Sequence, residues 1–456
     1  MIFNDVHKGF VARVAAAAAL LAVMIAAEPA HAATNNQNQE TVPLTIYNRS
    51  GLPGTWYVLV TGQDNSTGQY WYVSDTSGDV SSFPYGTKPS YVSPYKQYGI
   101  AFTKKTAITL NVPTLTATRI YVSYGRKMWI QPTKGVPSTP NGWQSTDKNY
   151  STLFDWAEYT WNDVAQPSNF QTSLNGNLTQ VDMLGLPMLL EFAGASATKP
   201  SVVTRAGFSS PKSRSQIFAA FAAAGAPWSN LVARPGRGIP LRVNSPYNGM
   251  KAGVLPKNQL AGYINKVFST YGSKTMVANT NAIPGPDVTF NGKVSGGNLV
   301  FTQEGNSANT VIFAKPTSNQ AYSGYGPSNL APNGTPLQLQ GSQIGTMVQA
   351  GFMRGTMITE PTISACPGTS AYYVNAPVNM YAKIMHQYAY QHKAYGFGYD
   401  DRCNQSSDES VFDPTEMALT IMPIDGTKVK PKHKKKHWNK KHKKRHGKRN
   451  HHRRHR

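Results

Sequence analysis

Two short stretches of the sequence each carry a carboxylate among aromatic and β-branched residues. Glu158 lies within Phe154–Asn162, and Asp182 lies within Leu178–Pro187. Aromatic and β-branched residues favour strands over surface loops. Both acids are therefore expected on or beside strands, where a buried, unpaired charge costs free energy.

The first stretch alternates between polar and aromatic residues. Glu158, Thr160 and Asn162 are two residues apart, and Tyr159 and Trp161 lie between them. Because successive side chains on a strand point to opposite faces, this pattern predicts a polar face and a buried face.

The segment between the two stretches predicts a loop. Residues Asp163–Asn177 are rich in Asn, Ser, Gly and Gln, which are common in connections. If the stretches pair antiparallel, Glu158 and Asp182 can share a face, about 5 Å apart at Cβ when directly opposed and about 7 to 8 Å when diagonal. Thr179 and Asp182 have opposite parity, so both reach one site only if a bulge or a strand end intervenes.

Two carboxylates on one exposed face are the minimal equipment for glycoside hydrolysis. One, protonated, donates to the leaving oxygen, and the other activates a water, for which a gap of about 6.5 to 9.5 Å leaves room. A polar hairpin with two surface acids is the alternative interpretation. Asp155, Asp163 and Glu191 are the substitute acids.

The two stretches resemble the catalytic segment of the glycoside hydrolase family 64 β-1,3-glucanases. The resemblance is carried by Trp156–Asn162 and Thr179–Pro187. It implies an inverting, endo-acting enzyme that typically releases laminaripentaose from β-1,3-glucan. It further implies that Glu158 is the general acid, that Asp182 is the general base, and that the sugar contacts are Thr160, Asn162 and Thr179.

The same resemblance implies a fold. Val42–Tyr47, Arg119–Lys127 and Tyr395–Asp401 look similar to parts of thaumatin-like proteins. We expect a β-rich α+β protein in which a thaumatin-like β-barrel or sandwich carries an inserted mixed α/β domain, with a cleft between the two. The 39 Gly, 31 Pro and 24 Tyr residues agree with a β-rich, loop-rich chain. Asp400 and Asp401 are interpreted as hydrogen-bonding turn residues rather than catalytic ones.

Short strands and helical repeats give the domain boundaries. The β domain is predicted over 41–205, the inserted α/β domain over 206–392, and the return to the β domain over 393–425. Helices are predicted at 215–224, 256–271, 339–354 and 378–392 from apolar spacing and caps. Strands are predicted at 42–47, 57–60, 70–73, 107–112, 119–124, 288–290, 298–302, 310–314 and 418–422.

The amino-terminal region has the pattern of a secretory signal peptide. His7, Lys8 and Arg13 precede an apolar run, and Ala30-His31-Ala32 offers a cleavage site between small residues. We therefore expect a signal peptide over 1–32, a polar linker over 33–40, and export; a membrane anchor is the alternative.

The only two cysteines, Cys366 and Cys403, predict one disulfide in an oxidising compartment. Neither has a second Cys or a His at metal-ligand spacing, so no metal and no cofactor are predicted.

Most of the positive charge is at the carboxyl terminus. Of the net charge of +23, 16 Lys and Arg residues lie in Lys428–Arg456 without an acid, which leaves +7 for the rest. Such a segment predicts a disordered tail over 426–456. An anionic cell-envelope polymer, phospholipid or lipopolysaccharide headgroups and nucleic acid would all bind it through charge, and an exported protein favours the envelope polymer.

Taken together, the sequence predicts a secreted, monomeric endo-β-1,3-glucanase, with retention at the cell surface as the tail's contribution. A thaumatin-like protein that binds β-glucan without cutting it is the first alternative, and a chain whose cationic tail is the functional part is the second.

Overall fold

The computed structural model describes residues 40–84, 93–103, 107–164, 169–235, 240–280, 287–374 and 378–424. The predicted signal peptide, the linker up to residue 39 and the basic tail lie outside these residues.

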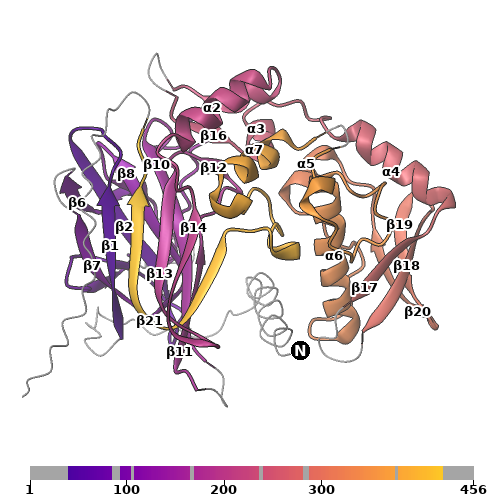
Figure 1. The fold of residues 1–456 in the computed structure, drawn as a ribbon, viewed down its shortest axis with the longest axis horizontal. Helices are drawn as coiled ribbons and strands as arrows, with labels where there is room; N and C mark the ends of the chain where they lie inside the picture. Colours follow the sequence, from indigo (N-terminus) through magenta and orange to yellow (C-terminus); the bar gives the residue numbers. More distant parts are fainter. Residues whose placement is uncertain are drawn as a thin grey trace, which may run out of the picture.

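A large, curled sheet dominates one side of the molecule (Figure 1). Its strand order is β14-β13-β21-β11-β10-β8-β2-β3-β4, with β1, β6 and β7 joined off this path. The strands of the sheet are β1 (Thr41–Asn48), β2 (Thr55–Asp64), β3 (Tyr70–Val73), β4 (Val80–Ser82), β6 (Ile100–Thr103), β7 (Ile108–Pro113), β8 (Leu115–Tyr124), β10 (Leu153–Asp163), β11 (Thr172–Asn177), β13 (Met188–Ser196), β14 (Lys199–Gly207) and β21 (Asp408–Ile421).

Alternating burial explains why these segments form a sheet. In β1, Val42, Leu44 and Ile46 are buried while their neighbours are not. In β10, Tyr159 and Trp161 are buried, and the intervening residues are partly exposed. The buried side chains meet in one hydrophobic core, and burying each large apolar side chain contributes roughly 1.5–3 kcal/mol.

The two acidic stretches do not pair with each other. Glu158 in β10 is paired with Asn177 of β11, so much of the predicted loop 163–177 is a strand. β11 lies between β10 and β21 and gains backbone hydrogen bonds on both sides. Gly176 permits this close packing, because a Cβ there would lie 2.5 Å from the Glu158 carbonyl oxygen and 2.7 Å from Phe192 Cζ.

Most of the remaining elements form smaller layers around a second core, whereas Tyr98, Met128 and Ile130 belong to a third, smaller hydrophobic cluster. In Figure 1, the β17–β20 sheet, α4 and α6 together form the right-hand side of the molecule, opposite the large sheet. The helices α2, α3 and α7 lie nearer to the large sheet. The helices are α2 (Ser213–Ala223), α3 (Pro246–Lys251), α4 (Ala261–Ser273), α5 (Ser318–Ser323), α6 (Pro336–Arg354) and α7 (Met380–Tyr388). The strands are β5 (Lys96–Tyr98), β9 (Met128–Ile130), β12 (Met183–Leu184), β15 (Val232–Ala233), β16 (Arg242–Asn244), β17 (Met276–Thr280), β18 (Val288–Ser295), β19 (Asn298–Gln303) and β20 (Asn306–Phe313), and the 3-10 turns are η2 (Trp228–Leu231), η3 (Thr369–Ala371), η4 (Tyr390–His392) and η5 (Arg402–Asn404).

Local sequence signals account for the helix ends. The Thr335 side chain accepts a hydrogen bond from the Gln338 amide at the start of α6, and Pro336 follows at the first helical position. Gly355 ends the same helix with a left-handed φ of 75°. Each of the four predicted helices is present, although α7 is shorter than its predicted range of 378–392. Over the described residues, no helix has both the length and the apolar character needed to cross a lipid bilayer.

The chain rejoins the large sheet at Asp408, whereas the prediction placed the return near Tyr395. Ala394 and Phe397 pack in the second core, and Tyr395 makes a single bridge to Thr179. From Asp408, β21 pairs antiparallel with β11 and β13 and parallel with β1. The last strand is therefore interior to the sheet.

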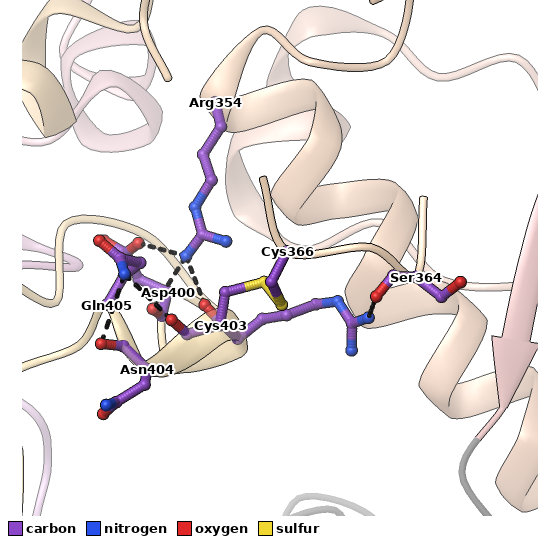
Figure 2. Close-up of a disulfide and its surroundings, with 8 residues drawn as sticks. Arg354, Ser364, Cys366, Asp400, Cys403, Asn404 and Gln405 are labelled. Atoms are coloured by element: carbon purple, nitrogen blue, oxygen red, sulfur yellow. Dashed lines mark hydrogen bonds and ion pairs between the residues drawn. A yellow bond between two sulfur atoms is a disulfide. The ribbon is translucent and has the colours of Figure 1, made fainter. Parts of the chain in front are cut away.

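A buried ion pair ties this returning segment to α6, and a disulfide ties it to the segment that follows α6. Cys366 and Cys403 are bonded to each other. Figure 2 shows the Arg354 guanidinium reaching Asp400 beside that disulfide, where Arg354 Nη2 lies 3.0 Å from Asp400 Oδ1. The opposite carboxylate oxygen, Oδ2, lies 2.9 Å from His386 Nε2 of α7. The returning segment is thus held to two helices before it enters the sheet.

Candidate active site

Glu158 projects from β10 with one carboxylate oxygen held by two donors. Its Oε1 accepts hydrogen bonds from Arg119 Nε at 3.0 Å and from Trp156 Nε1 at 3.1 Å. Arg119 comes from β8, directly opposite Glu158 in the register. Trp156 lies two residues before Glu158, on the same face of β10. The side chain is 30% exposed, so it can reach a ligand while its orientation is fixed.

Asp182 lies in a turn that precedes β12. Asn248 Nδ2 donates to Asp182 Oδ1 at 3.0 Å and also to its carbonyl oxygen. The Ser245 amide donates to that carbonyl as well. Pairing of β12 with β16 brings α3 and its Asn248 next to Asp182. One oxygen of each predicted acid is thus held by neighbouring side chains.

The carboxylates of Glu158 and Asp182 both shift the pKa of Arg119 and of Tyr121. Burial lowers the pKa of Arg119, but Tyr121, Glu158 and Asp182 outweigh it and raise that pKa above its usual value. Burial raises the pKa of Tyr121, and both acids raise it further against the effect of Arg119. Glu158 and Asp182 therefore share one electrostatic environment, with Arg119 as a common counter-charge.

Asp155 anchors the Asp182 segment to β10. Its Oδ2 accepts hydrogen bonds from the Gly185 and Leu186 amides at 2.7 and 3.0 Å. Its Oδ1 accepts one from the Trp156 amide. Burial raises the pKa of Asp155 to about 7, against the lowering effect of these three amides and of Arg242. This substitute acid is 2% exposed and is a structural residue.

Gln180 fixes the other end of the segment. The Tyr381 hydroxyl donates to its carbonyl oxygen at 2.6 Å. The Gln180 amide donates to the Tyr395 carbonyl, and the Tyr395 amide donates to Gln180 Oε1. Asp182 is therefore placed by contacts from β10, α3, α7 and the returning segment.

The three predicted sugar contacts have different settings. Thr160 and Asn162 are partly exposed on the face of β10 that carries Glu158. Thr179 is 7% exposed, and its hydroxyl accepts a hydrogen bond from the Val181 amide at 3.3 Å. Thr160 and Asn162 are available to a ligand, whereas Thr179 mainly shapes the turn before Asp182.

The other acids considered from the sequence lie in different environments. Asp163 is exposed at the end of β10. Glu191 pairs with Arg205 at 2.6 Å. Asp400 is fully buried between Arg354 and His386, which supports its interpretation as a structural residue.

Arg119, Trp156 and Asn248 belong to the site but were not predicted. The alternation of the strand already places Trp156 on the face of Glu158. Arg119 and Asn248 carried no comparable signal, because their proximity depends on strand register and on a helix 66 residues away. Among the described residues, no group of three His, Cys, Asp or Glu side chains could hold a metal ion.

Comparison with known proteins gives a consistent assignment. The glycoside hydrolase family 64 model, described as β-1,3-glucanase, matches residues 40–421. Glucan endo-1,3-beta-glucosidases of Cellulosimicrobium cellulans and of Arthrobacter sp. (strain YCWD3) are each 29% identical over 388 residues. These matches cover 85% of this chain and 66% of each relative, so the chain spans just under two thirds of their length.

Solved structures agree with the family match. The crystal structure of a laminaripentaose-producing β-1,3-glucanase in complex with laminaritetraose is 30% identical, with a TM-score of 0.71, and the match covers 84% of this chain and 99% of that one. A β-1,3-glucanase domain from Clostridium beijerinckii shares the fold at 22% identity, with a TM-score of 0.67 over 84% of this chain and 98% of that one. The chain belongs to glycoside hydrolase family 64, the β-1,3-glucanases.

Proposed function

We propose that this protein is an endo-acting β-1,3-glucanase that inverts the anomeric carbon and releases products of about the size of laminaripentaose. The observation that carries the proposal is that Glu158 forms an ion pair with Arg119 and that Asp182 also raises the pKa of the same guanidinium. Family membership and the solved relative with bound laminaritetraose support the substrate class.

The hydrogen bonds suggest how the two acids divide the work. Donors occupy Oε1 of Glu158, so a proton is best placed on Oε2, from which it passes to the leaving glycosidic oxygen. Asn248 holds Oδ1 of Asp182, so Oδ2 is left to take a proton from the attacking water. Bond cleavage and water attack on opposite faces of the sugar give inversion. Thr160 and Asn162 would bind sugar hydroxyls along β10.

The finer features of the fold and location belong to the same proposal. We infer that the large sheet is a thaumatin-like barrel, supported by the pairing of β1 with β21 across the length of the chain. Residues 206–392 would then be an insertion, supported by their packing in a separate core, with the glucan in a cleft between the two. The signal-like sequence of residues 1–32 supports export, and the basic tail supports retention at an anionic surface.

Two substitutions test the catalytic roles. Glu158→Gln and Asp182→Asn preserve shape and are expected to reduce release of oligosaccharides from curdlan or laminarin by at least about a thousandfold, because each removes an essential proton transfer. Circular dichroism of each variant checks that the fold is intact. Full activity in either variant would remove that residue from the mechanism.

The products separate the remaining alternatives. An α-anomer in the first products, seen by NMR, is expected for inversion, whereas a β-anomer would exclude it. Intact glucan after long incubation with retained binding would favour the binding-only alternative. Deletion of Lys428–Arg456 is expected to leave turnover of soluble substrate unchanged, and loss of that turnover would assign the function to the tail.

A further inference from the structure

Glu158 belongs to a row of side chains that crosses four neighbouring strands. Arg119 in β8 is in register with Glu158 in β10, Glu158 with Asn177 in β11, and Asn177 with Asp408 in β21. Side chains of directly paired residues point to the same face of a sheet. The ion pair of Arg119 with Glu158 confirms this for the first two members. Asp408 therefore faces the same side of the sheet as Glu158.

The spacing of the row places a second acid near the proposed acid. Adjacent strands lie roughly 4.8 Å apart, so two strand spacings separate Glu158 and Asp408 by about 10 Å at Cα. Only the small Asn177 lies between them in the row. That distance suits contact with a sugar unit next to the linkage that Glu158 would protonate.

The surroundings of Asp408 are those of a hydrogen-bonding group rather than an ion pair. Ser406 Oγ donates to Asp408 Oδ2 at 2.7 Å, and the side chain is partly exposed. Burial raises the pKa of Asp408 to about 6, against the effect of hydrogen bonds from Ser406 and Asn177, and Asp401 and Glu158 raise it further. A carboxyl that is partly protonated near neutral pH can both donate to and accept from a sugar hydroxyl.

We propose that Asp408 is a substrate-binding residue that contacts a hydroxyl of the glucosyl unit next to the cleaved linkage. This inference rests on the proposed function, because it assumes that glucan lies along the row. No cation pairs with Asp408 among the described residues, so a role as a buried salt-bridge partner does not explain it. The neighbouring acid Glu409 points to the opposite face, because it is the next residue along β21 and pairs with Gly176 rather than with Asn177.

The test measures binding without hydrolysis. In a Glu158→Gln background, calorimetry with laminarihexaose gives a Kd, and Asp408→Ala is expected to weaken it by about tenfold, which is the loss of one good hydrogen bond. Glu409→Gln in the same background is the matched control and is expected to stay within about twofold, because its side chain points away. An unchanged Kd in Asp408→Ala, or an equal loss in Glu409→Gln, would overturn the proposal.

A second variant and a kinetic readout keep the test decisive if Asp408→Ala does not fold. Asp408→Asn keeps the size of the side chain, but its single oxygen is needed to accept from Ser406, which leaves the sugar an NH2 group that cannot accept. A loss of at least about threefold is expected, and wild-type affinity there would also refute the role. In the otherwise wild-type chain, Asp408→Ala should raise KM with little change in kcat. If the wild type binds glucan but does not cut it, the proposed catalytic function is refuted, whereas the comparison of Kd values still decides whether Asp408 binds the sugar.

Discussion

At the scale of residues, the proposed site depends on the orientation of the two acids as well as on their presence. Arg119 and Trp156 hold one oxygen of Glu158, and Asn248 holds one oxygen of Asp182. In the proposed mechanism, the other carboxylate oxygen of each acid takes part in proton transfer. A family 64 site in this chain is thus built from donors that are spread over β8, β10 and α3.

Replacing Trp156 by Phe should slow catalysis by deleting one of these donors. An aromatic ring would remain, but Glu158 would lose the Nε1 hydrogen bond, and we expect kcat to fall by about tenfold, equivalent to one hydrogen bond to a charged group. Steady-state kinetics on laminarin measures the effect.

Trp161→Phe is the matched control for lost volume. Trp161 lies on the opposite face of β10 and is fully buried, and its Nε1 has no hydrogen-bond partner among the described residues. It should cost similar stability, roughly 1–3 kcal/mol for the cavity, while kcat is kept. Equal losses of kcat in both variants would show that packing, not the donor, matters.

The sequence predicted the polar face of β10 because alternation is a local property of any strand. It also singled out Glu158 and Asp182, although only through the resemblance. Arg119 was beyond reach, since its contact with Glu158 follows from the register of β8 with β10, and register is decided by the whole sheet.

At the scale of elements, Asp182 is positioned where its segment crosses β10 at Phe154 and Asp155, and not by a hairpin with β10. Residues 163–177 were predicted as a loop that would let the two acidic stretches pair, but Thr172–Asn177 pairs with β10 instead, despite its Asn and Gly content. Strand propensity is a weak guide for such a segment, because pairing on both edges and the buried Leu174 outweigh it. The second stretch then passes over Phe154 and Asp155, to which Gly185 is pressed closely.

Gly185→Ala should disturb this crossing. A Cβ at residue 185 would lie 2.3 Å from the Phe154 carbonyl oxygen, so the backbone must move. We expect a loss of about 1–3 kcal/mol in the free energy of unfolding. A shift of about 1 Å in Asp182 would further reduce kcat by roughly a hundredfold. Chemical denaturation and kinetics test the two effects.

Gly262→Ala in α4 is the control for adding a methyl group. Nothing lies within 4 Å of the position that its Cβ would take, and alanine favours a helix over glycine, so stability should rise by about 0.5–1 kcal/mol with unchanged activity. Wild-type kinetics in Gly185→Ala would mean that the crossing does not place Asp182.

At the scale of the whole molecule, buried titratable groups make stability depend on pH. His386 faces two acceptors, because its Nδ1 lies 2.8 Å from the His392 carbonyl oxygen and its Nε2 lies 2.9 Å from Asp400 Oδ2. Only the doubly protonated imidazolium can donate to both. Burial lowers the pKa of His386, but Asp400 and the His392 carbonyl outweigh burial and Arg354, so the net shift is upward.

The sign of the effect follows from this shift. A group whose pKa is raised in the folded state stabilises it fully below the unfolded pKa, which is near 6.5 for histidine, and loses that contribution as pH rises through the folded value. Asp400 has the opposite shift, since His386 and Arg354 lower its pKa against burial; its contribution is present above about pH 4 and is lost at lower pH. Burial raises the pKa of Asp155 and of Glu409 to about 7. Both groups therefore also make the folded state more stable below neutral pH than above it.

The melting temperature should therefore be highest in mildly acidic buffer and fall as pH increases above about 6.5, and His386→Gln should flatten the upper part of that fall. Asp155 and Glu409 titrate in wild type and variant alike, so the difference between the two melting curves isolates His386. His392→Gln is the matched control, because His392 is exposed and its replacement leaves the bond between His386 and Asp400 in place. Scanning calorimetry from pH 4 to pH 9 measures the melting temperature of all three proteins. Parallel curves for wild type and His386→Gln above pH 6.5 would show that the imidazolium does not stabilise the contact between α7 and the returning segment, whose Tyr395 binds Gln180.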